Sequence, residues 1–153
     1  MIRILTDSTS DLSPARAAEL GVEILPLSVQ FGEESFADGG DITKEFYAKL
    51  AQAEALPTTA QIPPDTFTGA FRRMTQNGDQ VLGIFISSAM SGTYQSARIA
   101  REVVGTSHIA LVNSQTVTFA LGLLVETACI LRDQGLPLEA LAAKVEQLSR
   151  RVR

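Results

Sequence analysis

The sequence predicts an α/β domain with a mainly parallel sheet flanked by helices, and three observations lead to this fold class. Short β-type runs alternate along the chain with longer stretches of helical periodicity. The runs 81–86 and 109–112 are almost entirely apolar, as expected for strands covered on both faces of a parallel sheet. The chain has 153 residues, of which 45% are apolar and 20% charged, and this composition supports one full-sized core.

Capping and turn-forming residues set the elements of the first 64 residues. Pro14 in a first helical turn and Gly21 just past the last turn bound a short helix, and Asp41 is placed to cap a later one. Three glycines between residues 32 and 40 indicate a turn, for which a hairpin is one candidate. In chain order we expect a strand over 2–6, a polar turn over 7–11, the short helix, a strand over 22–31, the glycine-rich turn, a helix over 46–55 and an extended loop over 56–64.

Apolar spacing sets the remaining elements. Asn77-Gly78 ends a helix that starts at Asp65 or Thr66, and Gly135 stops a long apolar helix. Pro137 opens a last helix in which apolar residues recur at a spacing of three and four. In chain order we expect a helix over 65–76, a strand over 81–86, a helix ending at 104, a strand over 109–112, a helix over 119–134 and a helix from 137.

Charge and residue counts exclude several classes of function. The formal net charge of −4 and a pI near 5.0 argue against a nucleic-acid surface. Cys129 and His108 are the sole residues of their kinds, so an internal disulfide and the usual Cys/His zinc sites are excluded. Cys129 lies in an apolar run, where a buried hydrophobe is its expected role.

The apolar segments are too short for the membrane. The first residues lack the features of a signal peptide. The longest apolar stretch, 117–131, contains Glu126 and falls short of the roughly 20 residues that a membrane-spanning helix needs. We therefore expect no membrane span and a cytoplasmic location.

Loops rich in hydroxyl groups follow the predicted strands. Residues 7–11, 87–93 and 113–116 leave the three clearest strands, and 57–61 is a fourth such loop. Ligands of open α/β sheets bind outside the carboxyl ends of the strands. Any one of these loops is more often a simple helix cap, but four on one edge favour a site for a carboxylate or a phosphate.

Covalent catalysis is not indicated. A serine nucleophile needs a base within hydrogen-bond reach, and His108 directly precedes a strand, which places it at the opposite, amino end of the sheet. The sequence has no Gly-x-Ser-x-Gly elbow, no phosphate-binding loop ending in Gly-Lys-Ser/Thr and no Gly-x-Gly-x-x-Gly turn after the first strand. The sequence thus predicts a binding protein without catalytic residues, resident metal or cofactor.

A second hypothesis is a magnesium-dependent phosphotransferase or hydrolase that uses Asp7 and Asp11. Against it, Asp11 can cap the following helix and Asp7 can organise its own turn. A third hypothesis is an interaction half-domain that assembles with a partner and binds no ligand by itself.

Thr59 and Ser91 support the binding-protein hypothesis. Two uncharged hydroxyls without a base can hold a carboxylate but cannot readily attack it. Ser91 opens a helix together with Gly92, which allows close backbone approach, and the helix from 119 and the strand from 81 offer apolar surface for a hydrocarbon tail. Thr58 and Ser8 are further candidate ligand-binding residues.

Five motifs in this sequence resemble the DegV family of bacterial fatty-acid-binding proteins, in family order and over essentially the whole chain. They are Thr6-Asp7-Ser8-Thr9-Ser10-Asp11-Leu12, Asp38-Gly39-Gly40-Asp41-Ile42-Thr43, Pro57-Thr58-Thr59-Ala60-Gln61, Ser87 to Thr93 with Tyr94-Gln95-Ser96-Ala97, and Asn113-Ser114 followed by Leu121-Gly122.

The resemblance implies a carrier that encloses one long-chain fatty acid and presents it to a fatty acid kinase. The kinase phosphorylates the bound carboxylate, and the acyl phosphate then enters phospholipid synthesis. In such proteins a threonine of the Pro-Thr-Thr loop and the serine of Ser-Gly-Thr hold the carboxylate, and these positions correspond to Thr59 and Ser91.

The sequence departs from the family pattern in three ways. Ala60 stands where a serine is usual, with Ile62-Pro63 changing the proline spacing, and Asn113 stands where Asp is usual. Family members have roughly twice this length, so residues 1–153 are expected to form the amino-terminal domain of a two-domain carrier. With one wall of the lipid tunnel missing, we expect this chain either to be free of ligand or to self-associate through exposed apolar surface.

Overall fold

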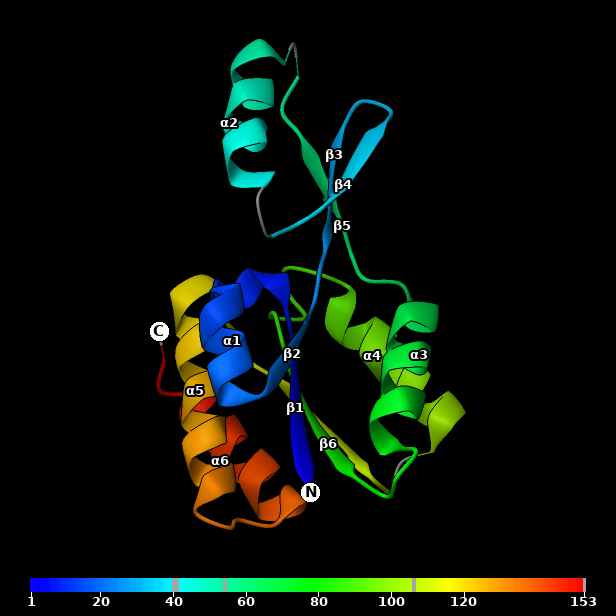
Figure 1. The fold of residues 1–153 in the computed structure, drawn as a ribbon, viewed down its shortest axis with the longest axis vertical. Coiled ribbons are helices and arrows are strands. Elements are labelled where there is room, and N and C mark those ends of the chain that lie inside the picture. Colours follow the sequence, from blue (N-terminus) through cyan, green and yellow to red (C-terminus); the bar gives the residue numbers. More distant parts are fainter. Residues whose placement is uncertain (40–41, 54, 106, 153) are drawn as a thin grey trace.

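The computed structural model contains a four-stranded parallel sheet and a three-stranded antiparallel sheet (Figure 1). It describes residues 1–39, 42–53, 55–105 and 107–152. The parallel sheet has the order β2-β1-β6-β7. Its strands are β1 (Ile2–Asp7), β2 (Val22–Leu25), β6 (Gln80–Phe85) and β7 (Ile109–Asn113). The predicted fold class, a mainly parallel α/β sheet with flanking helices, is confirmed.

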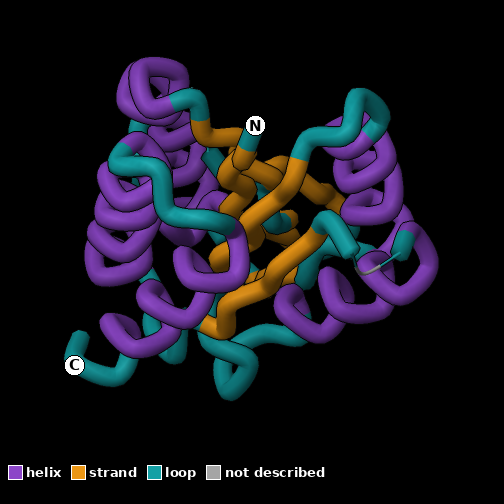
Figure 2. The backbone as a smooth tube through the Cα atoms, turned by 90° about the horizontal axis from the view of Figure 1, so that it is seen from below, coloured by secondary structure: helices purple, strands orange, loops and turns teal. Residues whose placement is uncertain are grey.

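Helices cover both faces of the parallel sheet (Figure 2). One face carries α1 (Pro14–Leu20), α5 (Thr118–Asp133) and α6 (Leu138–Ser149), and the other carries α3 (Pro64–Thr75) and α4 (Thr93–Val104). Ile4 and Leu5 of β1 are both fully buried, Ile4 in the hydrophobic cluster with α5 and α6 and Leu5 in the cluster with α3 and α4. Burial on both faces explains why the central residues of these strands are mostly apolar.

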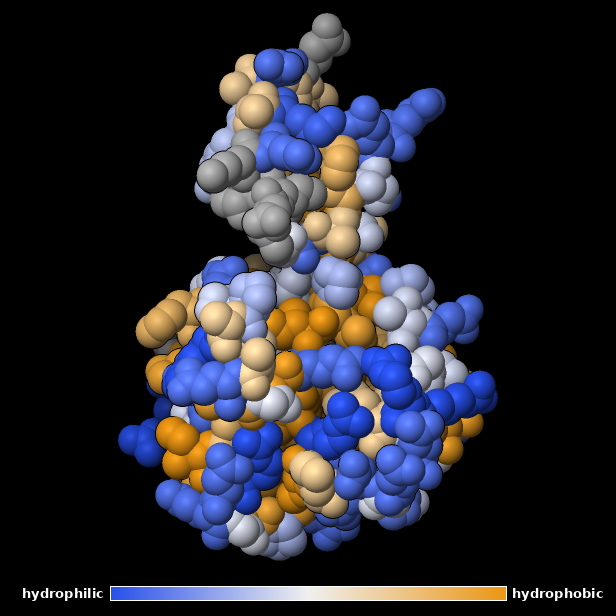
Figure 3. Space-filling view, viewed as in Figure 1, coloured by the Kyte–Doolittle hydropathy of each residue, from blue (hydrophilic) through white to orange (hydrophobic). Residues whose placement is uncertain are grey.

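The antiparallel sheet projects from the body together with one helix (Figure 1). It has the order β4-β3-β5, formed by β3 (Ser28–Phe31), β4 (Glu34–Ala37) and β5 (Thr58–Ala60). Helix α2 (Ile42–Gln52) packs on it through Phe46, whose ring centroid lies 5.6 Å from that of Phe31. The molecule narrows at the junction with the body, and apolar residues are exposed just below it (Figure 3).

Two predictions for this region are wrong. The expected strand over 22–31 is two strands in different sheets, because β2 ends at Leu25 and is followed by Pro26, which has no N–H to donate to a further strand pair. The expected loop over 56–64 contains β5, which pairs with β3. The hairpin at the glycine-rich turn is confirmed, with Gly32 at a φ of 59° between β3 and β4.

Helix α1 is capped by Ser13 and not by Asp11. Ser13 caps α1 by accepting a hydrogen bond from the Arg16 N–H at 3.2 Å, so the expected cap by Asp11 is wrong. Asp11 instead follows a short 3₁₀ turn, Ser8–Ser10, at a φ of 54°. The other expected cap, Asp41, lies outside the described residues.

The one cysteine and the one histidine of the chain lie as predicted. Cys129 is 1% exposed. His108 is exposed, and its carbonyl accepts a hydrogen bond from the Val81 N–H at the amino end of β6. Across the described part of the chain, no helix combines the length and the apolar character needed to span a bilayer.

Candidate functional site

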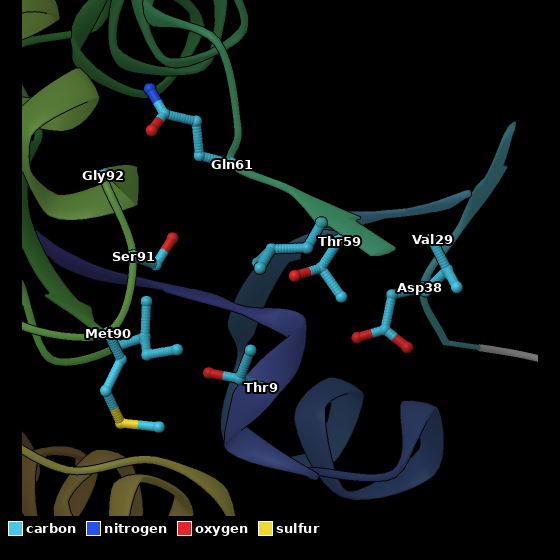
Figure 4. A pocket seen from close by; sticks show the side chains of 10 residues that line it. Thr9, Val29, Asp38, Thr59, Gln61, Met90, Ser91 and Gly92 are labelled. Atoms are coloured by element: carbon cyan, nitrogen blue, oxygen red, sulfur yellow. The ribbon is translucent and has the colours of Figure 1, made fainter. Parts of the chain in front are cut away.

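A cavity of about 430 Å³ opens at the carboxyl ends of β1 and β6 (Figure 4). In the strand order β2-β1-β6-β7, the chain proceeds from β1 to one side and later fills the other side from β6. The gap between β1 and β6 is therefore the point where the strand order reverses, which is the usual ligand site of open α/β sheets. The cavity is lined by Thr9, Leu27, Val29, Asp38, Thr59, Gln61, Ile86, Met90, Ser91 and Gly92.

The loop after β1 is organised by Asp7, which is fully buried. One carboxylate oxygen accepts hydrogen bonds from the Thr9 N–H at 3.0 Å and the Thr9 hydroxyl at 2.5 Å, and the other accepts from the Ile86 N–H at 2.8 Å. The pKa of Asp7 is raised above its ordinary value, because the effect of burial outweighs that of these three hydrogen bonds, which lower it. Because Thr9 and Ile86 both line the cavity, Asp7 ties its two sides together.

The loop after β6 presents Ser91 at the start of α4. The Ser91 hydroxyl accepts a hydrogen bond from the Thr93 N–H at 3.2 Å and shares another with the Thr93 hydroxyl at 2.9 Å. Ser91 is half-buried and lines the cavity, while Thr93 is fully buried behind it.

Gly92 leaves room for the Gln61 side chain. A Cβ on Gly92 would lie 1.8 Å from the Gln61 side-chain oxygen, and the Gln61 amide nitrogen donates to the Ser96 hydroxyl at 3.1 Å. The glycine thus lets the loop after β5 close over the start of α4.

The geometry of β5 determines which of Thr58 and Thr59 faces the cavity. Thr59 lines the cavity, and its neighbour in register on β3 is Val29, which also lines it. Successive residues of a strand point to opposite faces, so Thr58 points away from the face that carries Thr59. Among the described residues that line the cavity, Thr59 is present and Thr58 is not.

Ser8 lies beside the cavity rather than in its lining. Its hydroxyl donates to the Asp38 carboxylate at 2.7 Å and accepts from the Leu27 N–H at 3.0 Å. Ser8 therefore fixes the position of Asp38, which follows β4 and does line the cavity.

The hydroxyl-rich loop after β7, 113–116, supports the site from outside. The Asn113 side-chain oxygen accepts from the Ser88 N–H at 3.1 Å, and its amide donates to the Ser88 hydroxyl at 2.7 Å. The loop thus braces the loop after β6 but contributes none of the described lining residues. Three of the four predicted loops meet at the cavity.

Asp7 and Asp11 do not share a cavity. Asp7 serves the loop as described, whereas Asp11 is exposed and lines a neighbouring hollow of about 550 Å³ with Phe46 and Tyr47. The described residues contain no group of three or more His, Cys, Asp or Glu side chains placed to hold a metal ion. The geometry gives the two aspartates separate roles.

Three polar lining residues were not singled out by sequence reasoning. Thr9, Asp38 and Gln61 all lie within quoted motifs, but their type alone does not separate them from ordinary loop residues. A sequence signal existed for Thr9, which lies in the loop that directly follows a predicted strand of the parallel sheet. Asp38 and Gln61 follow β4 and β5 of the antiparallel sheet, whose pairing was not predicted, so no comparable signal marked them.

Comparison with known proteins places this fold among close relatives. The family model described as "Uncharacterised protein, DegV family" matches residues 1–153. A DegV domain-containing protein of Clostridium perfringens is 38% identical over 145 residues, which cover 94% of this chain and 52% of that protein. The chain spans about half the length of the curated relatives it matches.

Solved structures agree with the family model. A DegV family protein from Thermus thermophilus, described as fatty acid binding, superposes with a TM-score of 0.89 at 35% identity, covering 97% of this chain and 53% of that one. A stearic acid-binding protein from Eubacterium ventriosum gives 0.87 at 30% identity, covering 95% and 52%. DegV of Bacillus subtilis, a fatty acid binding protein, gives 0.86 at 27%, covering 97% and 54%. The chain belongs to the DegV family.

Proposed function

We propose that this chain binds a long-chain fatty acid and holds its carboxylate with the hydroxyls of Thr59 and Ser91. The observation that carries the proposal is that these residues, 32 positions apart in the sequence, line one cavity at the point where the strand order reverses. The fatty-acid-binding relatives of the same fold support it. Gly92 takes part through its backbone at the start of α4.

The lining suits a binder better than an enzyme. Its polar groups are hydroxyls, one amide and one carboxylate, and among the described residues none of the lining side chains is a histidine or a cysteine. The Thr59 and Ser91 hydroxyls can both donate to a carboxylate. The one carboxylate in the lining, that of Asp38, accepts from Ser8. Among the described residues, neither the Thr59 nor the Ser91 hydroxyl donates to a side-chain base that could make it a nucleophile. We therefore propose a carrier role without chemistry of its own.

The wider role is proposed from the family resemblance. Residues 1–153 would be the amino-terminal domain of a two-domain cytoplasmic carrier, with the acyl tail between the domains. The carrier would present the bound carboxylate to a fatty acid kinase, and the acyl phosphate would enter phospholipid synthesis. Exposed apolar side chains, such as Met90 at 63% and Phe119 at 78%, are available for self-association, which stays a prediction.

Native mass spectrometry tests the binding itself. The full-length, two-domain form, purified from a bacterial host or mixed with palmitate or oleate, should give a population heavier by one fatty acid. A spectrum of that form that shows only ligand-free protein after either fatty acid is added would refute the proposal.

Substitution of the two hydroxyl residues tests the assignment. Thr59→Ala or Ser91→Ala should weaken palmitate binding by about 1 kcal/mol or more for each charge-assisted hydrogen bond that is lost. Thr58→Ala is the matched control, because Thr58 lies on the same strand and faces away. Equal affinities for all three variants and the wild type would contradict the assignment.

A further inference from the structure

The charge of the cavity lining is one-sided. Among the described lining residues there is no Lys, Arg or His, and Asp38 is the one charged side chain. The remaining polar groups are the hydroxyls of Thr9, Thr59 and Ser91 and the amide of Gln61. From this chain, a ligand head group in the cavity therefore meets neutral donors and one carboxylate.

Asp38 is held in place by two elements. Its backbone N–H donates to the Leu27 carbonyl at 2.7 Å, and one of its carboxylate oxygens accepts from the Ser8 hydroxyl at 2.7 Å. Ser8 in turn accepts from the Leu27 N–H. Asp38 is half-buried, and its carboxylate points into the space between Thr59 and Thr9 (Figure 4). It is a fixed part of the cavity wall rather than a solvated surface acid.

The opposite wall carries a partial positive charge. Helix α4 starts beside Ser91 and Gly92, and a helix start is equivalent to roughly half a positive charge. That half charge and the hydroxyls favour one negative charge on a ligand. A second negative charge finds no further positive partner in the lining and is repelled by Asp38.

We propose that Asp38 is a specificity-determining residue that restricts this site to acyl chains with a neutral or singly charged head group and disfavours doubly charged phosphate head groups. The proposal rests on the proposed binding of an acyl chain with its head group in this cavity. One consequence concerns the product of phosphorylation. A bound carboxylate that becomes an acyl phosphate gains negative charge, so the site would hold this product less tightly than the fatty acid.

Asp38→Asn tests the proposal with little structural change. Asparagine has the same shape, and its side-chain oxygen can still accept from Ser8. Glu139→Gln is the matched control, since Glu139 is an exposed residue in the first turn of α6, an element that contributes nothing to the described lining of the cavity. It removes the same charge far from the site, where salt screens its effect.

The probes are three ligands with the same 12-carbon chain and different charge: dodecanol, laurate and dodecyl phosphate. Affinities are measured by calorimetry at pH 8, where the phosphate monoester is close to doubly charged because its second pKa is about 6. Asp38→Asn should leave dodecanol unchanged, tighten laurate about three- to tenfold, and tighten dodecyl phosphate by about the square of that factor. The gains should shrink at high salt.

The outcomes separate the two proposals. If the wild type binds neither laurate nor palmitate, the proposed function itself is refuted, and the role of Asp38 with it. If laurate binds but Asp38→Asn changes the three affinities equally, or not at all, fatty-acid binding stands and the role of Asp38 is overturned. The same charge-dependent gain in Glu139→Gln would also overturn it, because the effect would then be one of net charge.

Discussion

Replacing Gly122 by alanine should destabilise the protein, because helix α5 packs on the turn after β1 with no room for a side chain. A Cβ on Gly122 would lie 2.5 Å from the backbone oxygen of Ser10. Relaxed contacts between a carbon and a carbonyl oxygen are about 3.3 Å or longer. The opposing atom belongs to the backbone and cannot rotate away, so helix α5 and the turn after β1 would have to separate by about 1 Å.

Two effects of opposite sign set the magnitude. Alanine is favoured over glycine inside a helix by about 1 kcal/mol. Forcing an extra methyl group into a packed contact costs about 1–3 kcal/mol. The net change for Gly122→Ala is therefore a loss of up to about 2 kcal/mol in the free energy of unfolding.

Gly69 supplies a control with the same chemistry. It lies in the interior of α3, and a Cβ there would meet nothing within 4 Å. Gly69→Ala should therefore stabilise the protein by about 0.5–1 kcal/mol, which is the helix effect alone. The difference between the two substitutions isolates the contact between α5 and the Ser10 carbonyl.

Urea unfolding followed by far-UV circular dichroism measures both variants against the wild type. For a chain of this size, 1 kcal/mol also corresponds to about 2–4 °C in Tm. We expect Gly69→Ala above the wild type and Gly122→Ala below it. If Gly122→Ala is as stabilising as Gly69→Ala, the close packing of α5 on the turn that carries Thr9 is wrong.

Three further substitutions follow from individual contacts. Gly92→Ala should displace the Gln61 side chain and break its hydrogen bond to Ser96, seen as weaker palmitate binding with Tm nearly unchanged. Burial raises the pKa of the Cys129 thiol to about 11, against 9.0 for an unburied thiol. As the pH rises, the thiol therefore ionises first in the unfolded chain, which stabilises the unfolded state. The free energy of unfolding should fall by up to about 2 kcal/mol between pH 9 and pH 11. Cys129→Ala should abolish this fall, which urea unfolding at pH 8 and 10.5 would detect. Ser13→Ala should cost about 1 kcal/mol in the same measurement through loss of the α1 cap.

The parallel sheet was predictable because the local sequence pattern indicates its strands. Residues 81–86 and 109–112 are almost entirely apolar, and this follows from burial on both faces. Helices elsewhere in the chain have clear starts and stops at residues such as Pro14, Gly21 and Gly135. Local pattern and tertiary environment agree in this part of the chain.

The antiparallel sheet was not predictable in the same way. Strand β5 has three residues, two of them exposed, and it exists because it pairs with β3 about 30 positions earlier in the chain. Neither the pairing nor the exchange of sheets at Pro26 leaves a periodic signal. The role of Gly122 depends likewise on a contact with Ser10, 112 positions away, so its identity carries meaning only in the folded structure.

The assignment of Thr59 depends on the strand that the sequence did not reveal. In an extended loop, Thr58 and Thr59 are equivalent candidates, and both hydroxyls could reach a head group. In β5 the register Val29 with Thr59 fixes which of them faces the cavity, and a slip of one residue would exchange them. The cavity is thus specified by two different means. Buried Asp7 holds the side formed by Thr9 and Ile86, whereas strand register in an exposed sheet holds the side formed by Thr59.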